Sequence, residues 1–176
     1  MKSRTKYLRF TLIIFLICFA GFLAAHFFVQ RTVVKGSSME PVLSDGDNLI
    51  VDRMAPLKHK IQRFDIVEFT YLYKKHTYFV KRVYGLPGET VQITDEGDIL
   101  IDGKKISDKY GKEKISDPGI AAYPIKLGAG EYFVLGDNRN HSEDSRYSDV
   151  GTVKSEQIVG KVITRIFPFD KAGRVS

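Results

Sequence analysis

Apolar residues are arranged differently in the first thirty residues and in the rest of the chain. Residues 10–29, FTLIIFLICFAGFLAAHFFV, carry no formal charge, and only Thr11 and His26 among them are clearly polar. A helix of about 20 residues spans the roughly 30 Å hydrocarbon layer of a bilayer. A helix at the surface of a protein core would alternate apolar and polar faces, and this run does not. The pattern therefore predicts one transmembrane helix over residues 10–29.

A cleaved secretory signal is the alternative interpretation of this segment, because such signals also begin with basic residues. Their apolar part is only about 7–15 residues long and leads to a cleavage site with small residues. Here the apolar run is longer, and the Ala pair at 24–25 is followed by His26 and two Phe residues. We therefore expect an uncleaved anchor.

Beyond residue 36, short runs of β-branched and aromatic residues alternate with turns that contain Gly, Pro and Asp. This pattern predicts strands joined by tight turns, and no long amphipathic pattern competes with it. The expected strands are 48–53, 66–72, 77–84, 90–94, 99–101, 132–135 and 158–167. Residues 104–130 break the pattern, and we expect a mobile surface loop or insertion there. The predicted fold class is mainly β, with an antiparallel domain over residues 30–176.

The net charge of the chain lies almost entirely at its N-terminal end. There are 27 Lys and Arg against 21 Asp and Glu, but residues 1–35 hold six of the bases and no acid, so the remainder is balanced. Bases precede the apolar run at Lys2, Arg4, Lys6 and Arg9 and follow it at Arg31 and Lys35. By the positive-inside rule, this asymmetry predicts a cytoplasmic segment at 1–9 and an extracytoplasmic domain, in a single-pass protein of the plasma membrane. It argues against a nucleic-acid partner, for which a basic patch on the domain is expected.

Cysteine and histidine usage indicates neither a disulfide nor a metal framework. Cys18 is the only cysteine and cannot form an internal bridge, and no His pair has the spacing of a helical zinc motif. We expect no metal and no cofactor.

Three segments carry residues suited to chemistry. The turn GSSMEP at 36–41 can expose a serine Oγ, although adjacent serines before a proline are more often plain turn formers. In YFVKRVY at 78–84, alternation places Lys81 on an apolar strand face, where burial would lower its pKa and make it a base. A lysine that snorkels from an edge strand is the alternative.

The polar run at 136–146 follows an apolar strand and either supports a site or is a solvated loop. Its possible ion-pair partners are Asp137, Arg139, Asp144 and Arg146.

Taken together and in this order, these segments resemble the type I signal peptidases, in particular the short, single-anchor form of Gram-positive bacteria. The matching stretches are GSSMEPVL at 36–43, RFDIVEF at 63–69, YFVKRVYGLPGET at 78–90 and GDNRNHSEDSR at 136–146. The resemblance implies the antiparallel β fold of signal peptidases and LexA-like self-cleaving repressors. It also implies a membrane-bound serine endopeptidase that removes signal peptides from exported preproteins, with the lipid bilayer as its second partner.

The resemblance assigns roles to individual residues. It makes Ser38 the nucleophile and Lys81 the general base of a Ser–Lys dyad. Ser142 matches the serine that hydrogen-bonds and orients the lysine amine. Asp144 and Arg146 match the charged residues that stabilise the loop of the site.

The resemblance also implies an oxyanion hole and a substrate site. Gly36 stands where many relatives carry a serine hydroxyl, so backbone donors would supply more of the oxyanion stabilisation. The substrate is expected to bind as an extended strand, with small residues at −1 and −3, between the chain near 34–38 and the chain near 78–81. The expected substrate-binding residues are Val34, Lys35, Ser37, Met39, Tyr78, Phe79 and Val80.

Two other functions stay open at this point. One is a specialised Ser–Lys processing peptidase of the same fold, such as a pilin or conjugation type. The other is a non-catalytic, membrane-anchored β domain, against which the joint presence of Ser38, Lys81 and Ser142 argues.

Overall fold

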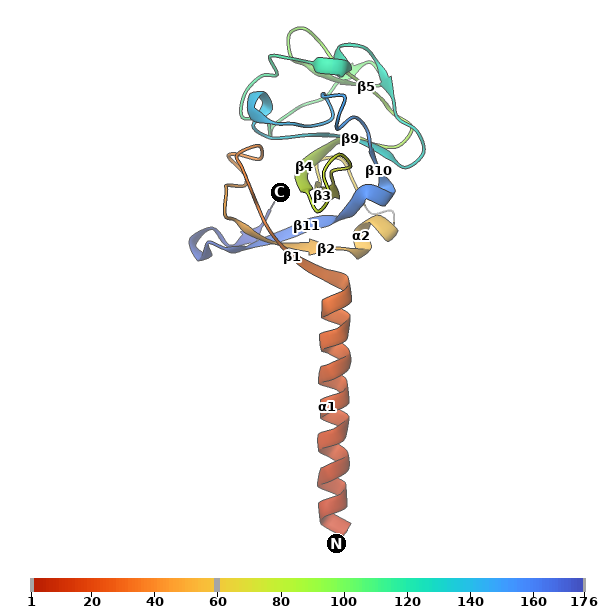
Figure 1. Cartoon of the computed structure of the whole chain (residues 1–176), viewed down its shortest axis with the longest axis vertical. Coiled ribbons are helices and arrows are strands. Elements are labelled where there is room, and N and C mark those ends of the chain that lie inside the picture. The colour runs from red at the N-terminus through yellow and green to blue at the C-terminus, as the bar shows by residue number, and fades with distance from the viewer. Residues whose placement is uncertain (1, 59–60, 176) are drawn as a thin grey trace.

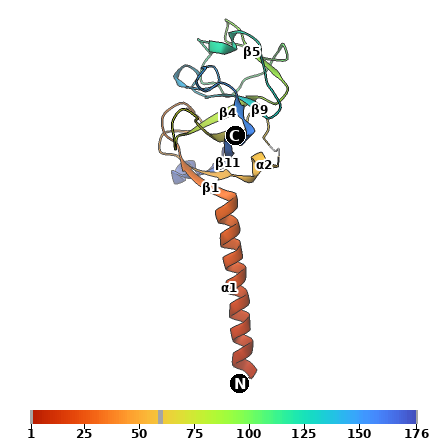
Figure 2. The ribbon, with the colours of Figure 1, turned by 45° about the vertical axis from the view of Figure 1, so that its right-hand side comes forward.

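A computed structural model describes residues 2–58 and 61–175 of the chain. The side chains at 2–6, 8 and 23–27 lie outside this description. Three of the bases that predict the membrane orientation, Lys2, Arg4 and Lys6, are among them. A long helix, α1 (Lys2–Phe28), extends away from a β domain that contains the rest of the chain (Figure 1). The same arrangement is seen after a 45° turn (Figure 2). Within the described residues, no helix combines the length and the apolar character needed to cross a membrane. The transmembrane span expected at 10–29 is therefore not supported by the structure.

Helix α1 ends earlier than the apolar run that predicted it. Val29 begins strand β1 (Val29–Val33), which pairs antiparallel with β2 and buries alternate residues only partly. The sequence pattern missed β1 because its first residue continues the apolar run. Pairing with β2 decides the conformation there, since tertiary contacts override local propensity.

The larger of two antiparallel sheets contains β4, the strand that carries Lys81. Its strands run in the order β1-β2-β11-β3-β4-β9-β10, and β12 pairs with β11 outside this path. Their bounds are β2 (Asn48–Asp52), β3 (Ile66–Thr70), β4 (Tyr78–Gly85), β9 (Glu131–Leu135), β10 (Val153–Lys154), β11 (Ile158–Phe167) and β12 (Gly173–Arg174). A short helix, α2 (Met54–Leu57), follows β2, and 3₁₀ turns lie at η2 (Arg139–His141), η3 (Ser155–Gln157) and η4 (Phe169–Lys171).

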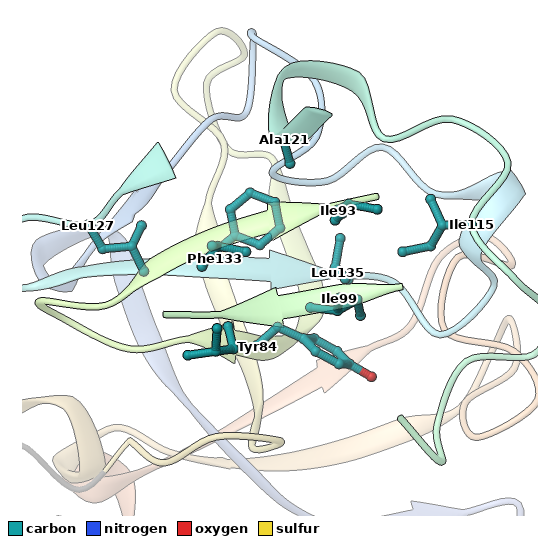
Figure 3. Packing of buried hydrophobic residues seen from close by; sticks show 10 residues of the cluster. Tyr84, Ile93, Ile99, Ile115, Ala121, Leu127, Phe133 and Leu135 are labelled. Atoms are coloured by element: carbon teal, nitrogen blue, oxygen red, sulfur yellow. The ribbon is translucent and has the colours of Figure 1, made fainter. Parts of the chain in front are cut away.

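A smaller sheet covers the end of the domain that lies farthest from α1 (Figures 1 and 2). Its strand order is β7-β6-β5-β8, and its elements are β5 (Thr90–Ile93), β6 (Ile99–Ile101), β7 (Lys104–Lys105), η1 (Gly119–Ala122) and β8 (Ile125–Lys126). Between this sheet and β4 and β9 lies a core cluster, in which Tyr84 and Phe133 contact isoleucines of β5 and β6 (Figure 3).

Residues 104–130 differ from the surface loop expected there. They form β7, η1 and β8, and they bury Ile115, Ala121 and Leu127 in the same core cluster. Strands of two residues have no periodic pattern, so the sequence signal in this segment was dominated by its lysines. All seven expected strands are present, with ends that differ by no more than two residues.

Two further core clusters flank β4. The side of β4 that carries Phe79 packs against a cluster that includes Val67 and Val83, and Val80 packs against a cluster that includes Val34 and Met39. Successive side chains of a strand point to opposite faces, so β4 is buried from both sides at this point. The site lies where these two clusters meet.

Candidate active site

The turn at 36–41 and strand β4 bring Ser38 and Lys81 into contact. Lys81 Nζ donates a hydrogen bond to Ser38 Oγ at 2.7 Å. The two residues are 43 positions apart in sequence, so the contact depends on the tertiary fold. Lys81 shares a face with Phe79, as alternation predicts, because its Nζ lies 5.1 Å from the Phe79 ring centroid. An exposed, snorkelling lysine is excluded, since only 4% of Lys81 is accessible.

Burial makes Lys81 a stronger candidate for a base than an ordinary lysine. Loss of solvation lowers the pKa of its amine from 10.5 to about 8. Nearby carboxylates of Asp144, Glu143 and Asp137 oppose this shift by favouring the charged form, and the burial effect exceeds theirs. At neutral pH, an appreciable fraction of this amine is therefore neutral and able to accept a proton.

The loop at 136–146 holds the Ser38 turn in place through its backbone. The Asn138 N–H donates to the Ser38 carbonyl at 3.0 Å, and the Asn138 side-chain amide donates to the Ser37 carbonyl at 3.0 Å. At the start of the turn, Gly36 adopts φ +85°, and its N–H donates to Asp45 Oδ1 at 2.7 Å. That φ lies in the left-handed region, which glycine adopts without steric cost.

Asp144 and Arg146 form the buried ion pair expected within this loop. Arg146 Nε lies 2.8 Å from Asp144 Oδ1, and both side chains are at most 2% accessible. Asp144 Oδ2 also accepts a hydrogen bond from the Gly136 N–H at 3.0 Å. The pair therefore closes the loop onto its own first residue.

The other two charged residues of the loop pair outside it. Asp137 binds Arg82 through two hydrogen bonds, of 2.7 and 2.8 Å, and both side chains are fully buried. Arg139 binds Asp108 at 2.7 Å. Strand alternation indicates that Arg82 faces away from Lys81, but the sequence did not predict its ion pair with Asp137. Asp108 carried no such signal.

Ser142 lies beside the dyad without completing the expected contact. It is 6% accessible, and among the described residues its Oγ has no hydrogen-bond partner, so the bond to the Lys81 amine is not formed. Gly136 makes the close approach possible: a Cβ at this position would lie 2.1 Å from Ser142 Oγ and 2.5 Å from the Ser38 carbonyl oxygen. Ser38, Gly136 and Ser142 are thus packed against one another.

A cleft of about 700 Å³ opens at Ser38 and runs between the chain at 31–39 and the chain at 74–81. The seven predicted substrate-binding residues all line it: Val34, Lys35, Ser37, Met39, Tyr78, Phe79 and Val80. In the described pairings, β9 joins β4 only at 82–85, so residues 78–81 have no strand neighbour on that side. The cleft therefore offers a free strand edge to an extended peptide.

Comparison with known proteins identifies the family. A family model described as "Signal peptidase, peptidase S26" matches residues 5–167. The chain belongs to this family. Signal peptidase I T of Bacillus subtilis (strain 168) is 35% identical to this S26 peptidase over 97% of the chain and 90% of the relative. Signal peptidase I of Bacillus caldolyticus is 41% identical over 81% and 82% of the two chains.

This S26 peptidase is also similar to solved structures. A crystal structure of a signal peptidase I from Enterococcus faecalis V583 has 33% sequence identity and a TM-score of 0.45. The similarity covers 58% of this chain and 96% of that chain.

Sequence reasoning missed several residues that line the cleft of this S26 peptidase, among them Thr32, Glu68, His141 and Glu143. Glu68 lies within the matching stretch RFDIVEF, where an acid among apolar strand residues was the available signal. Thr32 belongs to β1, which the hydrophobic pattern did not predict. His141 and Glu143 belong to the loop at 136–146 and were noted only as part of it.

Proposed function

We propose that this S26 peptidase removes signal peptides from exported preproteins, with Ser38 as the nucleophile and Lys81 as the general base. One observation carries the assignment: a buried amine with a lowered pKa lies 2.7 Å from a serine Oγ at the end of a cleft. A serine hydroxyl is a weak nucleophile unless an adjacent base accepts its proton. The distance is within the range that direct proton transfer requires.

The reaction is an acyl transfer in two stages. Neutral Lys81 accepts the Ser38 proton as Oγ attacks the scissile carbonyl, and the resulting ammonium then protonates the leaving amine. The amine departs with the mature protein, and the signal peptide remains as an ester on Ser38. Neutral Lys81 then accepts a proton from water as its oxygen attacks the ester carbonyl. The bond to Ser38 Oγ breaks, Lys81 returns the proton to Oγ, and the signal peptide leaves with a free carboxyl group.

The substrate lies as an added strand between residues 34–38 and residues 78–81. Strand addition uses the backbone groups of the free edge, and pockets for alternate side chains provide the selectivity. The residues at −1 and −3 share one face of an extended strand, so both point to the same wall of the cleft. We propose that this wall favours small side chains at these two positions.

Helix α1 attaches the enzyme to a lipid bilayer, with its N-terminus in the cytoplasm and the domain on the outer side of the plasma membrane. This part of the proposal is supported by the apolar run at 10–29 and by the bases that precede it. Large apolar side chains of α1 are also exposed, including Phe10, Phe15 and Ile17. Contiguous apolar surface of this kind is typical of a site that contacts lipid or a partner.

The decisive experiment is cleavage of a preprotein by the full chain in detergent. We expect wild type to cleave after an Ala at −1, and Ser38→Ala and Lys81→Ala each to abolish cleavage. Ser148→Ala and Lys104→Ala are matched controls, because both side chains are exposed and outside the cleft. Full activity in either dyad variant would refute the assignment.

A further inference from the structure

Glu68 is a buried carboxyl in the substrate cleft for which the dyad mechanism has no use. It belongs to β3, is 1% accessible and lines the cleft. Thr32 Oγ1 donates to Glu68 Oε1 at 2.6 Å, and Gln30 Nε2 donates to Oε2 at 3.3 Å. Among the described residues, no ion pair with Glu68 is found. Burying a carboxyl group without a cation costs free energy of folding. Its presence in a binding cleft therefore suggests a role in binding.

The two hydrogen bonds connect strands that are not neighbours in the sheet. Strand β1 is separated from β3 by β2 and β11, yet Thr32 and Gln30 reach Glu68. Both residues lie on the inner face of β1, since they alternate with exposed neighbours. Glu68 therefore lines the cleft and, through these two hydrogen bonds, links β3 to β1.

Strand register places Glu68 on the wall that receives the side chains at −1 and −3. Glu68 pairs directly with Val80 across β3 and β4, so the two side chains point to the same face. Val80 packs on the cluster that contains Val34 and Met39, the latter next to Ser38. On the opposite side of the cleft, in the chain at 31–39, Val34 and then Thr32 lie progressively farther from Ser38 along the sequence.

A bound peptide can be placed against these landmarks. This step rests on the proposed function, in which the residues before the cut lie between the two walls. The side chain at −1 is then next to Ser38 and Met39. The side chain at −3 lies on the same face, about 7 Å farther along the strand, toward Thr32 and Glu68.

We propose that Glu68 is a specificity-determining residue that accepts a hydrogen bond from the substrate side chain at −3 and so favours a small hydroxyl residue there. A carboxylate has about four acceptor positions, and Thr32 and Gln30 occupy two of them. A site built to bind a hydroxyl discriminates against an isosteric side chain that lacks it, because its own polar group then stays unpaired. Thr and Val are such a pair, with nearly the same shape.

The test is a set of peptide substrates with Ala at −1 and Ala, Thr or Val at −3, cleaved by the full-length enzyme. For wild type we expect kcat/KM at least about tenfold higher for Thr than for Val, since a side chain without the hydroxyl leaves the buried acceptor unpaired, at a cost of about a factor of ten or more. Glu68→Met keeps the length of the side chain and removes the acceptors, so the Thr/Val ratio should fall to about one. Thr32→Val removes the bond to Glu68 but keeps the carboxyl, so the preference for Thr should persist.

Each outcome decides the proposal. Equal cleavage of the Thr and Val substrates by wild type overturns it, as does a ratio that Glu68→Met leaves unchanged. Loss of the ratio in Thr32→Val as well as in Glu68→Met would show that Glu68 only braces β1, and would overturn it too. If Glu68→Met does not fold, Glu68→Gln replaces it, and its weaker, neutral acceptor should lower the ratio severalfold. Failure of wild type to cleave even the Ala substrate would refute the proposed function instead.

Discussion

At the scale of single residues, the chemistry of the site depends on how far burial changes Lys81. Its amine has only Ser38 as a hydrogen-bonding neighbour in the contacts given above, and it is almost fully shielded from water. Because the neutral form is the base, activity should follow the deprotonated fraction of this amine. The pKa of about 8 therefore determines the pH range in which the enzyme works.

We expect kcat/KM to fall about tenfold per pH unit below pH 8 and to level off above it. The sign follows from the mechanism, since protonation below the pKa removes the base. The measurement is a pH profile of kcat/KM with the Ala substrate, in buffers of constant ionic strength. A profile that is flat between pH 6 and 8 would show that a different group accepts the Ser38 proton.

The same burial of Lys81 should lower the free energy of unfolding. Its pKa is about 8 in the folded chain and 10.5 as an ordinary lysine, so folding favours proton release, and stability should rise as pH increases from about 8 to 10.5. Below pH 8 the full penalty applies, on the order of 3 kcal/mol at about 1.4 kcal/mol per pKa unit. Lys81→Met should therefore raise the free energy of unfolding at pH 7 by up to about 3 kcal/mol, with little gain at pH 11. Denaturant titrations at the two pH values measure this difference, and equal gains at both would contradict it.

Gly136 tests the packing around Ser38 and Ser142. Gly136→Ala would force a Cβ against the Ser38 carbonyl and the Ser142 hydroxyl, so we expect a loss of about 3 kcal/mol of stability and a loss of activity of more than tenfold. Gly128→Ala is the matched control, because its Cβ would meet only the flexible end of Glu131. Thermal unfolding and cleavage of the Ala substrate are measured side by side. A Gly136→Ala enzyme as stable and active as the control would show that the close approach has no functional weight.

At the scale of elements, β4 contacts the turn at 36–41 through one face and the loop at 136–146 through the other. Lys81 points to Ser38, and Arg82 points the other way to Asp137, which begins the loop that holds the Ser38 turn. Alternation within YFVKRVY predicts this division, so the sequence contains it. The partner of Arg82 could not be predicted, because the pairing of β4 with β9 depends on long-range register that a single sequence does not specify.

Breaking this pair should loosen the loop. Arg82→Met leaves Asp137 as an uncompensated buried charge, and we expect a loss of about 3–5 kcal/mol in the free energy of unfolding. The double variant Arg82→Met/Asp137→Leu removes both charges and should recover a large part of that loss. A double-mutant cycle by chemical denaturation gives the coupling energy. If the double variant is less stable than Arg82→Met alone, the pair is not what holds β4 to the loop.

At the scale of the whole molecule, sequence reasoning succeeded where a pattern repeats or a motif is dense. The long strands, the contact between Ser38 and Lys81, and seven of the residues that line the cleft were predicted from such signals. Strands β7, β8, β10 and β12 are too short to show periodicity, and the curvature that brings β1 to β3 leaves no local trace. The contribution of residues 104–130 to the core was missed for the same reason, because three buried side chains are scattered among charged ones.

The separation between α1 and the β domain leads to a prediction about where the enzyme can act. If α1 holds the enzyme at a bilayer, charges placed in its middle should release it, since each costs about 2.5–3.5 kcal/mol in a membrane interior. Leu16→Asp/Ile17→Asp should move the chain from the membrane fraction to the soluble fraction. It should retain cleavage of the short Ala peptide, because Ser38 and Lys81 lie in the β domain, and lose cleavage of a preprotein embedded in vesicles. Lys104→Asp/Lys105→Asp in the small sheet is the control for added negative charge, and these side chains are exposed. A charged α1 that still fractionates with membranes would show that another surface of the domain binds lipid.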